Sequence, residues 1–320
     1  METPELPRNP SLFSPTPERR SAPRTVTPLQ VPAVDGTPFL RFPLSQDALT
    51  KCVRNALDED QAFNDLTTIA TVRSDRRARA MLRARRAGVA CGIPLALEAF
   101  RQVDPKVSIR VDAEDGTRLK EGDAVLYLTG HARGLLSAER VALNFLQRLS
   151  GIASLTCRYV DAVKDTKARI LDTRKTTPGW RTLEKYAVCA GGGQNHRRDL
   201  ASAILIKDNH LAACDGDVAL AVRRAREIAP SGTKVEVECD QPQQVRSALE
   251  AGADIIMLDN MSLEAMRESV AIVGGKATLE ASGGITLDNV RDVAGVGVDW
   301  ISIGALTHSA PALDLALDFD

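Results

Sequence analysis

From about residue 155 onward, short apolar segments alternate with segments of helical pattern, and this alternation constrains the fold more than any other feature. Strands are predicted at 168–175, 203–210, 234–240, 254–260, 277–284 and 299–305. Helices are predicted at 217–229, 242–251, 262–273 and 286–294, with Asp217, Ser262 and Thr286 as candidate N-caps. Continuous apolar strands that alternate with helices are typical of a parallel sheet with helices outside it.

Polar residues stand at or near the carboxyl end of these predicted strands. In strand order they are Asp172, Arg174 and Lys175; Lys207 and Asp208; Glu236 and Glu238; Asp259 and Asn260; Glu280 and Ser282; and then Gly304. At a single strand end, exposure to solvent alone could explain polar residues. Such residues on every strand in succession favour a β/α barrel, whose active sites are built at the carboxyl ends of the strands.

The last two predicted strands are followed by glycine-containing loops. Ser282, Gly283 and Gly284 follow one strand, Gly304 follows the next, and His308 lies just beyond. Glycines leave backbone N–H groups open to an anion, and the loops after the final strands of such barrels recurrently bind phosphate. Two tight turns are the alternative interpretation.

A cationic cluster lies between residues 171 and 210. It holds seven Lys or Arg and four acidic residues, a local balance of +3 in a protein of net charge -1, together with His196 and His210. Arg presents paired donors to carboxylates and phosphates, whereas Lys acts as a point charge. Because three glycines at 191–193 bring backbone beside these cations, the cluster predicts a ligand with several negative groups, although a solvated charged face is the alternative.

Glu238 and Asp259 are the carboxylates expected at neighbouring strand ends. They could hold Mg²⁺, which prefers carboxylates, waters and phosphate oxygens, or accept hydrogen bonds from ribose hydroxyls. Neither a Rossmann glycine motif at a strand-to-helix turn nor a P-loop motif occurs. No HxH or HxxxH pair occurs, so zinc chemistry is not predicted.

The N-terminal half is predicted to form a smaller layer of mixed structure. A helix is expected from about Leu44 to Leu57, a strand at 77–86 and tight-turned β-structure at 114–130. Ser137 is the expected cap of a helix that Gly151 would end. Residues 1–38 are rich in proline and lack apolar periodicity, which predicts a disordered extension.

Composition excludes several functional classes. No apolar run reaches the roughly 18 residues of a membrane-spanning helix. The near-neutral charge and 4% aromatic content disfavour nucleic-acid binding. Six scattered cysteines without a CxxC pair predict reduced thiols, and no secretory signal is apparent, so a cytoplasmic location is expected.

Eight ordered motifs together resemble the quinolinate phosphoribosyltransferase family, also called nicotinate-nucleotide pyrophosphorylase. The resemblance covers the chain from about Leu44 to its end. The motifs are AERVALNFLQRLSGIAS, DTRKTTPGWR, GGGQNHRRDL, LIKDNH, VEVE, IMLDN, EASGGIT and ISIGALTHSAPALD. The resemblance implies transfer of a phosphoribosyl group from 5-phosphoribosyl-1-pyrophosphate to quinolinate with decarboxylation, giving nicotinate mononucleotide, pyrophosphate and CO₂.

The resemblance also implies roles for individual residues. Lys207, Glu238 and Asp259 are expected to be catalytic, with Mg²⁺ held by Glu238 and Asp259. The residues expected to bind quinolinate are Arg140, Arg174, His196, Arg197 and Lys207. The residues expected to bind the phosphoribosyl donor are Lys175, Glu238, Asp259, Ser282, Gly283, Gly284, Gly304 and His308.

The implied fold is α/β, with an N-terminal α/β sandwich domain at 39–153 and an incomplete, about six-stranded β/α barrel at 154–306. Residues 307–320 would pack back on the sandwich. The implied assembly is a homodimer, or an assembly of dimers, in which Arg140 reaches the neighbour's site. Two other functions stay open: a related enzyme that uses nicotinate with ATP coupling, and a non-catalytic sensor of phosphorylated sugars or pyridine metabolites. The cationic cluster favours the dicarboxylate over nicotinate.

Overall fold

The computed structural model describes residues 40–319, so the extension expected at 1–38 lies outside the described residues. Its C-terminal half holds one parallel six-stranded sheet in the order β6-β11-β10-β9-β8-β7. The strands are β6 (Arg169–Leu171), β7 (Ile204–Ile206), β8 (Val235–Cys239), β9 (Ile255–Asp259), β10 (Thr278–Ser282) and β11 (Trp300–Ser302). This arrangement confirms the open α/β barrel that the sequence predicted.

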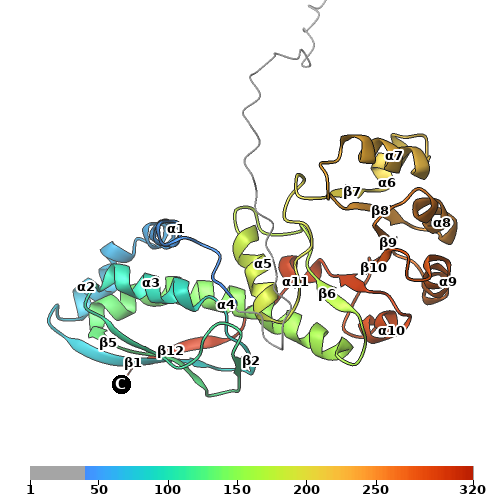
Figure 1. Cartoon of the computed structure of the whole chain (residues 1–320). Helices are drawn as coiled ribbons and strands as arrows, with labels where there is room; N and C mark the ends of the chain where they lie inside the picture. The colour runs from blue at the N-terminus through green and yellow to red at the C-terminus, as the bar shows by residue number, and fades with distance from the viewer. Residues whose placement is uncertain (1–39, 320) are drawn as a thin grey trace, which may run out of the picture. The chain divides into compact units, whose positions relative to one another are not determined.

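Helices cover the outside of these strands (Figure 1). They are α5 (Arg181–Ala190), α6 (Asp208–Ala212), α7 (Val218–Ile228), α8 (Pro242–Glu250), α9 (Leu263–Val273), α10 (Val290–Gly295) and α11 (Ala305–His308). Asp217 and Ser262 cap α7 and α9 through their side chains, as predicted. Thr286 does not cap α10, because the helix starts later, with Asn289 at its N-cap. The side chain of Asn289 instead accepts a hydrogen bond from the backbone N–H of Thr286 at 2.9 Å.

The opening of the barrel lies between β6 and β7, which are the two edge strands of the sheet. The segment 191–195 runs along the free side of β6, where Gln194 forms a parallel bridge with Leu171. Gln194 N–H donates to the carbonyl of Ile170 at 2.8 Å, and Asp172 N–H donates to the carbonyl of Gln194 at 3.1 Å. A loop segment therefore occupies part of the place that a further strand would take.

The N-terminal half holds an antiparallel sheet in the order β12-β1-β5-β3. Its strands are β1 (Arg77–Ala84), β3 (Ser108–Val111), β5 (Ala124–His131) and β12 (Leu315–Phe319), beside a two-stranded pair of β2 (Gly88–Val89) and β4 (Arg118–Leu119). The helical elements of this half are α1 (Gln46–Glu59), η1 (Ala62–Asn64), α2 (Leu66–Thr71) and α3 (Ile93–Val103). Along β1, every second residue from Ala80 to Ala84 is buried, which fits the strand predicted at 77–86.

The helix α4 (Ala132–Val163) is far longer than the sequence suggested. Ser137 lies inside it rather than at its cap, and its hydroxyl donates to Asp65 at 3.0 Å. Gly151 also lies inside it and does not end it. A Cβ atom at Gly151 would lie 2.1 Å from the carbonyl oxygen of Pro311, so this glycine is required by the close approach of the C-terminal segment.

Among residues 40–319, no helix combines the length and the apolar character that crossing a membrane requires.

Candidate functional site

Two arginines predicted to bind the substrate lie close enough to repel each other. Arg174 follows β6, and Arg197 follows the segment that borders β6. Burial lowers the pKa of Arg197, and the positive charge of Arg174 lowers this pKa further. The Nε atom of Arg174 is buried and has no hydrogen-bond partner among the described residues. Adjacent cations with an unused buried donor are suited to a bound anion.

A buried ion pair fixes the loop that presents these arginines. Lys185 on α5 bonds to the carboxylate of Asp172 and donates to the carbonyl of His196 at 3.0 Å. The same carboxylate accepts the backbone N–H of His196 at 2.9 Å. Burial raises the pKa of Asp172 to about 6, although the charge of Lys185 opposes the rise. The pair therefore ties the end of β6 to the segment that carries His196 and Arg197.

The predicted catalytic residues come from three neighbouring strands. Lys207 directly follows β7, and its Nζ lies 2.5 Å from Oε2 of Glu238 on β8. Asp259 ends β9 and accepts a hydrogen bond from the side chain of Asn260 at 2.7 Å. The strand predicted at 203–210 ends earlier, at Ile206, and α6 begins at Asp208. Lys207 consequently stands at the N-cap of α6, between the strand and the helix.

The loop after β11 approaches the loop after β6 at Gly304. A Cβ atom at Gly304 would lie 3.0 Å from Cδ of Lys175 and 3.1 Å from Nε2 of His308. The hydroxyl of Thr307 donates to the carbonyl of Lys175 at 2.7 Å, which joins the loop after β6 to α11. The structure thus brings together three of the residues predicted to bind the phosphoribosyl donor.

The loop after β10 contacts the end of β9. Gly283 has a φ of +85°, and a Cβ atom there would lie 2.3 Å from the Asn260 side-chain oxygen. Ser282 lies opposite Asp259 in the register of β10 and β9. Ser282, Gly283 and Gly284 therefore lie beside the end of β9, where Asp259 and Asn260 stand.

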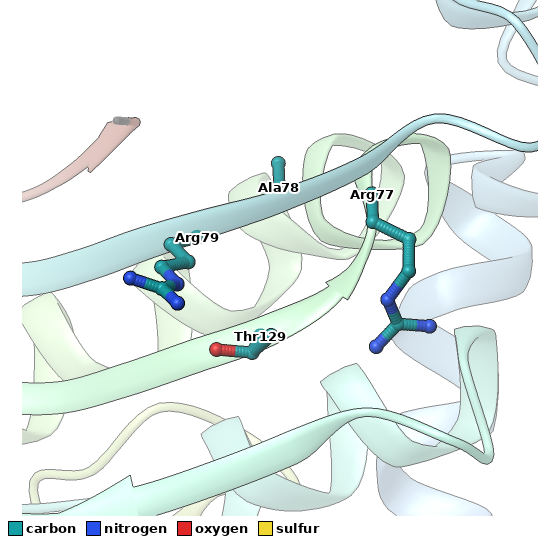
Figure 2. Close-up of a pocket in the computed structure, with 4 residues that line it drawn as sticks. All are labelled: Arg77, Ala78, Arg79 and Thr129. Carbon is teal, nitrogen blue, oxygen red and sulfur yellow. The ribbon is translucent and has the colours of Figure 1, made fainter.

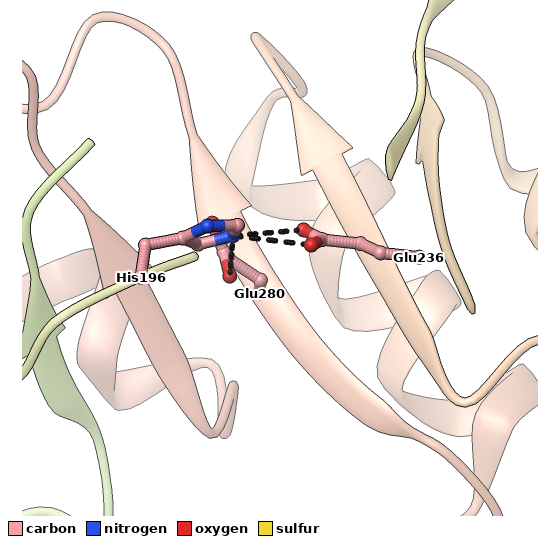
Figure 3. Close-up of side chains that lie close together, drawn as sticks. All are labelled: His196, Glu236 and Glu280. Carbon is pink, nitrogen blue, oxygen red and sulfur yellow. Dashed lines mark hydrogen bonds and ion pairs between the residues drawn. The ribbon is translucent and has the colours of Figure 1, made fainter. Parts of the chain in front are cut away.

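One cluster inside the barrel was not predicted from the sequence. His196 Nε2 lies 3.1 Å from Oε2 of Glu236 on β8 and 3.4 Å from Oε2 of Glu280 on β10 (Figure 3). All three side chains are at most 9% exposed, and both carboxylate oxygens of Glu280 have no hydrogen-bond partner among the described residues. These ligand atoms are close enough to hold a metal ion. Sequence spacing could not reveal the cluster, because its members come from three separate segments.

The ring of His196 experiences two opposing influences. Burial would lower its pKa, but the nearby carboxylates of Glu236 and Glu280 outweigh burial and raise the pKa. The backbone N–H of Arg197 donates to Nδ1 at 2.8 Å, and this bond requires an unprotonated Nδ1. In the neutral ring that accepts this bond the hydrogen lies on Nε2, and in the protonated ring both nitrogens carry one. Nε2 carries a hydrogen in either form.

A separate pocket of about 240 Å³ lies on the N-terminal sheet, lined by Arg77, Ala78, Arg79 and Thr129 (Figure 2). It is formed by β1 and β5, and none of the predicted site residues lines it. The carboxyl ends of the barrel strands, not this pocket, hold the candidate site.

Comparison with known proteins agrees with this arrangement. Residues 65–150 match the model of the quinolinate phosphoribosyl transferase N-terminal domain, and residues 152–318 match that of the C-terminal domain. The chain belongs to the quinolinate phosphoribosyltransferase family. This membership confirms the resemblance that the motifs indicated.

Similar proteins within the family align over most of the chain. The Mycobacterium leprae nicotinate-nucleotide pyrophosphorylase [carboxylating] is 44% identical over 280 residues, which cover 85% of this chain and 97% of the relative. The probable Bacillus subtilis enzyme of the same name is 42% identical over 270 residues, covering 84% and 93%. The solved structure of NadC from Streptococcus pyogenes has a TM-score of 0.82 at 42% identity, covering 87% of this chain and 99% of that chain.

Arg140 is the predicted quinolinate residue that the barrel does not carry. It lies on α4 in the N-terminal half, where it is exposed. Burial raises the pKa of the neighbouring Glu139, and the positive charge of Arg140 opposes this rise. Within a single copy of the family fold, Arg140 belongs to a different structural half from Arg174 and Arg197.

Proposed function

We propose that this protein transfers the phosphoribosyl group of 5-phosphoribosyl-1-pyrophosphate to the ring nitrogen of quinolinate in NAD biosynthesis. The products are nicotinate mononucleotide, pyrophosphate and CO₂. The observation that carries the proposal is the match of both halves of the chain, residues 65–150 and 152–318, to the two domains of this family. The cationic cluster between residues 171 and 210 supports it, because quinolinate bears two adjacent carboxylates.

The quinolinate pocket in this proposal uses charge in two ways. Arg174 and Arg197 would receive the two carboxylates as paired donors, which relieves the repulsion that lowers the pKa of Arg197. Lys207 adds a point charge beside Glu238. A monocarboxylate such as nicotinate would leave more of this positive charge unbalanced, so the pocket favours the dicarboxylate.

The phosphoribosyl donor in this proposal lies across the ends of β8 to β11. Lys175, Gly304 and His308, which the close approach at Gly304 supports as one group, would bind phosphate oxygens. The loop of Ser282, Gly283 and Gly284 would bind the 5-phosphate through backbone N–H groups. Glu238 and Asp259 would face the ribose hydroxyls from neighbouring strands.

The reaction needs no covalent enzyme intermediate. The bond from the anomeric carbon to pyrophosphate breaks, and the leaving pyrophosphate takes the electron pair. Glu238 would stabilise the cation-like ribose, and the lone pair of the quinolinate nitrogen forms the new bond. The resulting pyridinium accepts the electrons of the adjacent carbon–carboxylate bond, so CO₂ leaves and a proton from solvent replaces it. Positioning and charge carry most of the rate enhancement.

Magnesium fits the donor set of this site. Carboxylate oxygens are ligands that Mg²⁺ prefers, and Glu238 and Asp259 offer them from adjacent strands. These two residues would hold the ion together with phosphate oxygens of the donor. When bound, Mg²⁺ neutralises charge on the leaving pyrophosphate.

The proposal places the chemistry at the ends of the barrel strands, and two variants test this. Lys207→Ala and Glu238→Ala are each expected to lower turnover by orders of magnitude while circular dichroism shows an unchanged fold. Near-normal turnover in either folded variant would contradict the assigned roles.

The proposed assembly is a homodimer in which Arg140 completes the neighbour's quinolinate pocket. It is supported by the exposure of Arg140 on α4 and by its separation from the barrel residues in sequence and structure. Mixing an Arg140→Ala chain with a Lys207→Ala chain would create some sites with both native residues. Partial recovery of activity is expected, and no recovery after verified exchange of subunits would refute the shared site.

The proposed domain organisation is a sandwich at 39–153, a barrel at 154–306 and a C-terminal return at 307–320. It is supported by the pairing of β12 with β1, which places the end of the chain in the N-terminal sheet. A cytoplasmic location is part of the proposal, and it is supported by six free cysteines.

The deciding experiment supplies the purified protein with quinolinate, 5-phosphoribosyl-1-pyrophosphate and Mg²⁺ and measures nicotinate mononucleotide. Nicotinate serves as the parallel substrate, with and without ATP. Product from quinolinate alone is expected. Product only from nicotinate would move the protein to the related activity, and ligand binding without product from either would favour the sensor.

A further inference from the structure

A buried ion pair between α4 and α5 has no role in the proposed reaction. The guanidinium of Arg148 on α4 lies 2.8 Å from the carboxylate of Glu184 on α5. The Glu184 side chain is 0% exposed, and that of Arg148 is 29% exposed. A buried carboxylate costs free energy unless it is paired and hydrogen-bonded, so the partners of Glu184 indicate which parts of the chain this pair joins.

Glu184 holds the loop between β6 and α5. Its Oε2 accepts the backbone N–H of Thr177 at 3.0 Å, and its Oε1 accepts the Thr177 hydroxyl at 2.8 Å. Thr177 lies in this loop two residues after Lys175. The buried carboxylate therefore fixes the loop next to a residue proposed to bind phosphate.

Arg148 holds the segment that follows β11. It donates to the carbonyl of Thr307 at 2.5 Å and to the carbonyl of Ala310 at 3.3 Å. Thr307 belongs to α11 and precedes His308, another residue proposed to bind phosphate. The ion pair thus connects the loop after β6 with α11, where α4, α5 and α11 contact one another (Figure 1).

The position of Lys175 depends on the backbone that this pair holds. Among residues 40–319, the hydrogen bonds of Lys175 involve only its backbone. Its N–H donates to the Thr173 hydroxyl at 3.1 Å, and its carbonyl accepts the Thr307 hydroxyl at 2.7 Å. Its side chain reaches Gly304, where a Cβ atom would lie 3.0 Å from Cδ of Lys175 and 3.1 Å from Nε2 of His308. A shift of either connected segment would therefore separate Lys175 from His308.

We propose that Glu184 and Arg148 are positioning residues for the phosphoribosyl donor. The buried pair holds the loop after β6 on one side and α11 on the other. It thereby fixes the backbone from which Lys175 and His308 reach one phosphate group of the donor. The pair acts through these two residues and does not touch the reacting atoms. This inference rests on the proposed function for its ligand, but its geometry can be tested without any ligand.

The ligand-free test is limited proteolysis of the full chain with trypsin, followed by mass spectrometry. Glu184→Gln removes the charge and one acceptor oxygen, so cleavage after Lys175 is expected to become about 10-fold faster than in the wild type. Cleavage after Lys276, in the exposed turn between α9 and β10, should keep its rate, which separates local release from unfolding. Unchanged cleavage after Lys175 would overturn the proposal.

A milder variant keeps this test decisive if Glu184→Gln does not fold. Thr177→Val removes only the hydroxyl bond to Glu184, from an exposed side chain. Cleavage after Lys175 should then rise about threefold. An unchanged rate in folded Thr177→Val would overturn the proposal in the same way.

The kinetic test is the KM for 5-phosphoribosyl-1-pyrophosphate in two single variants and their double variant. Glu184→Gln and Arg148→Met are each expected to raise this KM about 10-fold. Because the two residues act as one pair, the double variant should show a similar increase, whereas independent effects would multiply to about 100-fold. Such a product, or an unchanged KM in either folded single variant, would overturn the proposal.

Two controls separate positioning from general damage. The KM for quinolinate should rise less than about threefold in Glu184→Gln, because the carbonyl of Arg174 is held separately by the Arg181 guanidinium at 3.4 Å. An equal rise in both KM values would overturn the proposal. Asp161→Asn, a matched loss of the exposed α4 carboxylate that pairs with Arg118, should change neither KM. If the wild-type chain forms no product, the proposed function fails, while proteolysis still decides the geometry.

Discussion

Replacing Lys185 by methionine should destabilise the protein strongly, because it would leave a carboxylate buried without its cation. The side chains of Lys185 and Asp172 are 6% and 0% exposed. Asp172 also accepts the backbone N–H of His196, which remains in the variant. Removing one partner of a buried ion pair typically costs about 3–5 kcal/mol, and we expect Lys185→Met to fall in this range near pH 8.

The stability lost in Lys185→Met should depend on pH in a direction set by the pKa of Asp172. Burial raises the pKa of Asp172 from 3.8 to about 6 in the folded protein, a difference of ~3 kcal/mol. The folded state therefore binds this proton more readily than the unfolded state, and stability falls as pH rises from about 4 to about 6. The charge of Lys185 lowers the pKa of Asp172, so removing Lys185 raises this pKa further. The variant should therefore lose less stability relative to the wild type at pH 5 than at pH 8.

The measurement is urea unfolding, followed by circular dichroism, at pH 5 and pH 8. The control is Lys167→Met, because Lys167 is 59% exposed in its pair with Asp299 and should contribute about 0–1 kcal/mol. Adding Asp172→Asn to Lys185→Met should recover much of the loss. A loss below about 1 kcal/mol, or an equal loss at both pH values, would refute the reasoning.

Three smaller changes test how the loops are held. Gly151→Ala should lower stability by about 1–3 kcal/mol in urea unfolding despite alanine's helix propensity, because the added methyl would overlap a backbone carbonyl. Gly283→Ala should raise the KM for the phosphoribosyl donor and leave quinolinate affinity unchanged, because its methyl would displace Asn260. Thr307→Val should raise the same KM, since the hydroxyl bond to the Lys175 carbonyl is lost; an unchanged KM in either variant would contradict the assigned loop contacts.

The sequence predicted the proximity of candidate residues where the order of the strands brings them together. Lys207, Glu238 and Asp259 lie at or next to the carboxyl ends of successive parallel strands, so their proximity follows from strand order. His196 could not be assigned in this way, because its partners Glu236 and Glu280 lie 40 and 84 positions later in the chain. Only the path of the intervening segment across the barrel shows that they meet.

Glycine explains the largest error in predicted secondary structure. An isolated glycine after an apolar helical pattern usually marks a C-terminal cap, which is why Gly151 was expected to end a helix. Inside α4 the same residue instead permits the close approach of the backbone at Pro311. Local pattern cannot separate these roles, since both require the absence of a Cβ atom and only the second depends on a segment 160 positions away.

The opening of the barrel and the position of the proposed quinolinate pocket have a common physical cause. A complete strand between β6 and β7 would commit its backbone to the sheet and alternate its side chains in and out. The segment after α5 bonds to β6 only near Gln194 and then leaves the edge, so consecutive residues can serve different purposes. His196 turns into the barrel toward Glu236, while the guanidinium of the next residue, Arg197, donates to the carbonyl of Ala203. The incomplete barrel thus leaves Arg197, beside His196, outside the hydrogen-bond ladder of the sheet, where the proposed quinolinate pocket needs its guanidinium.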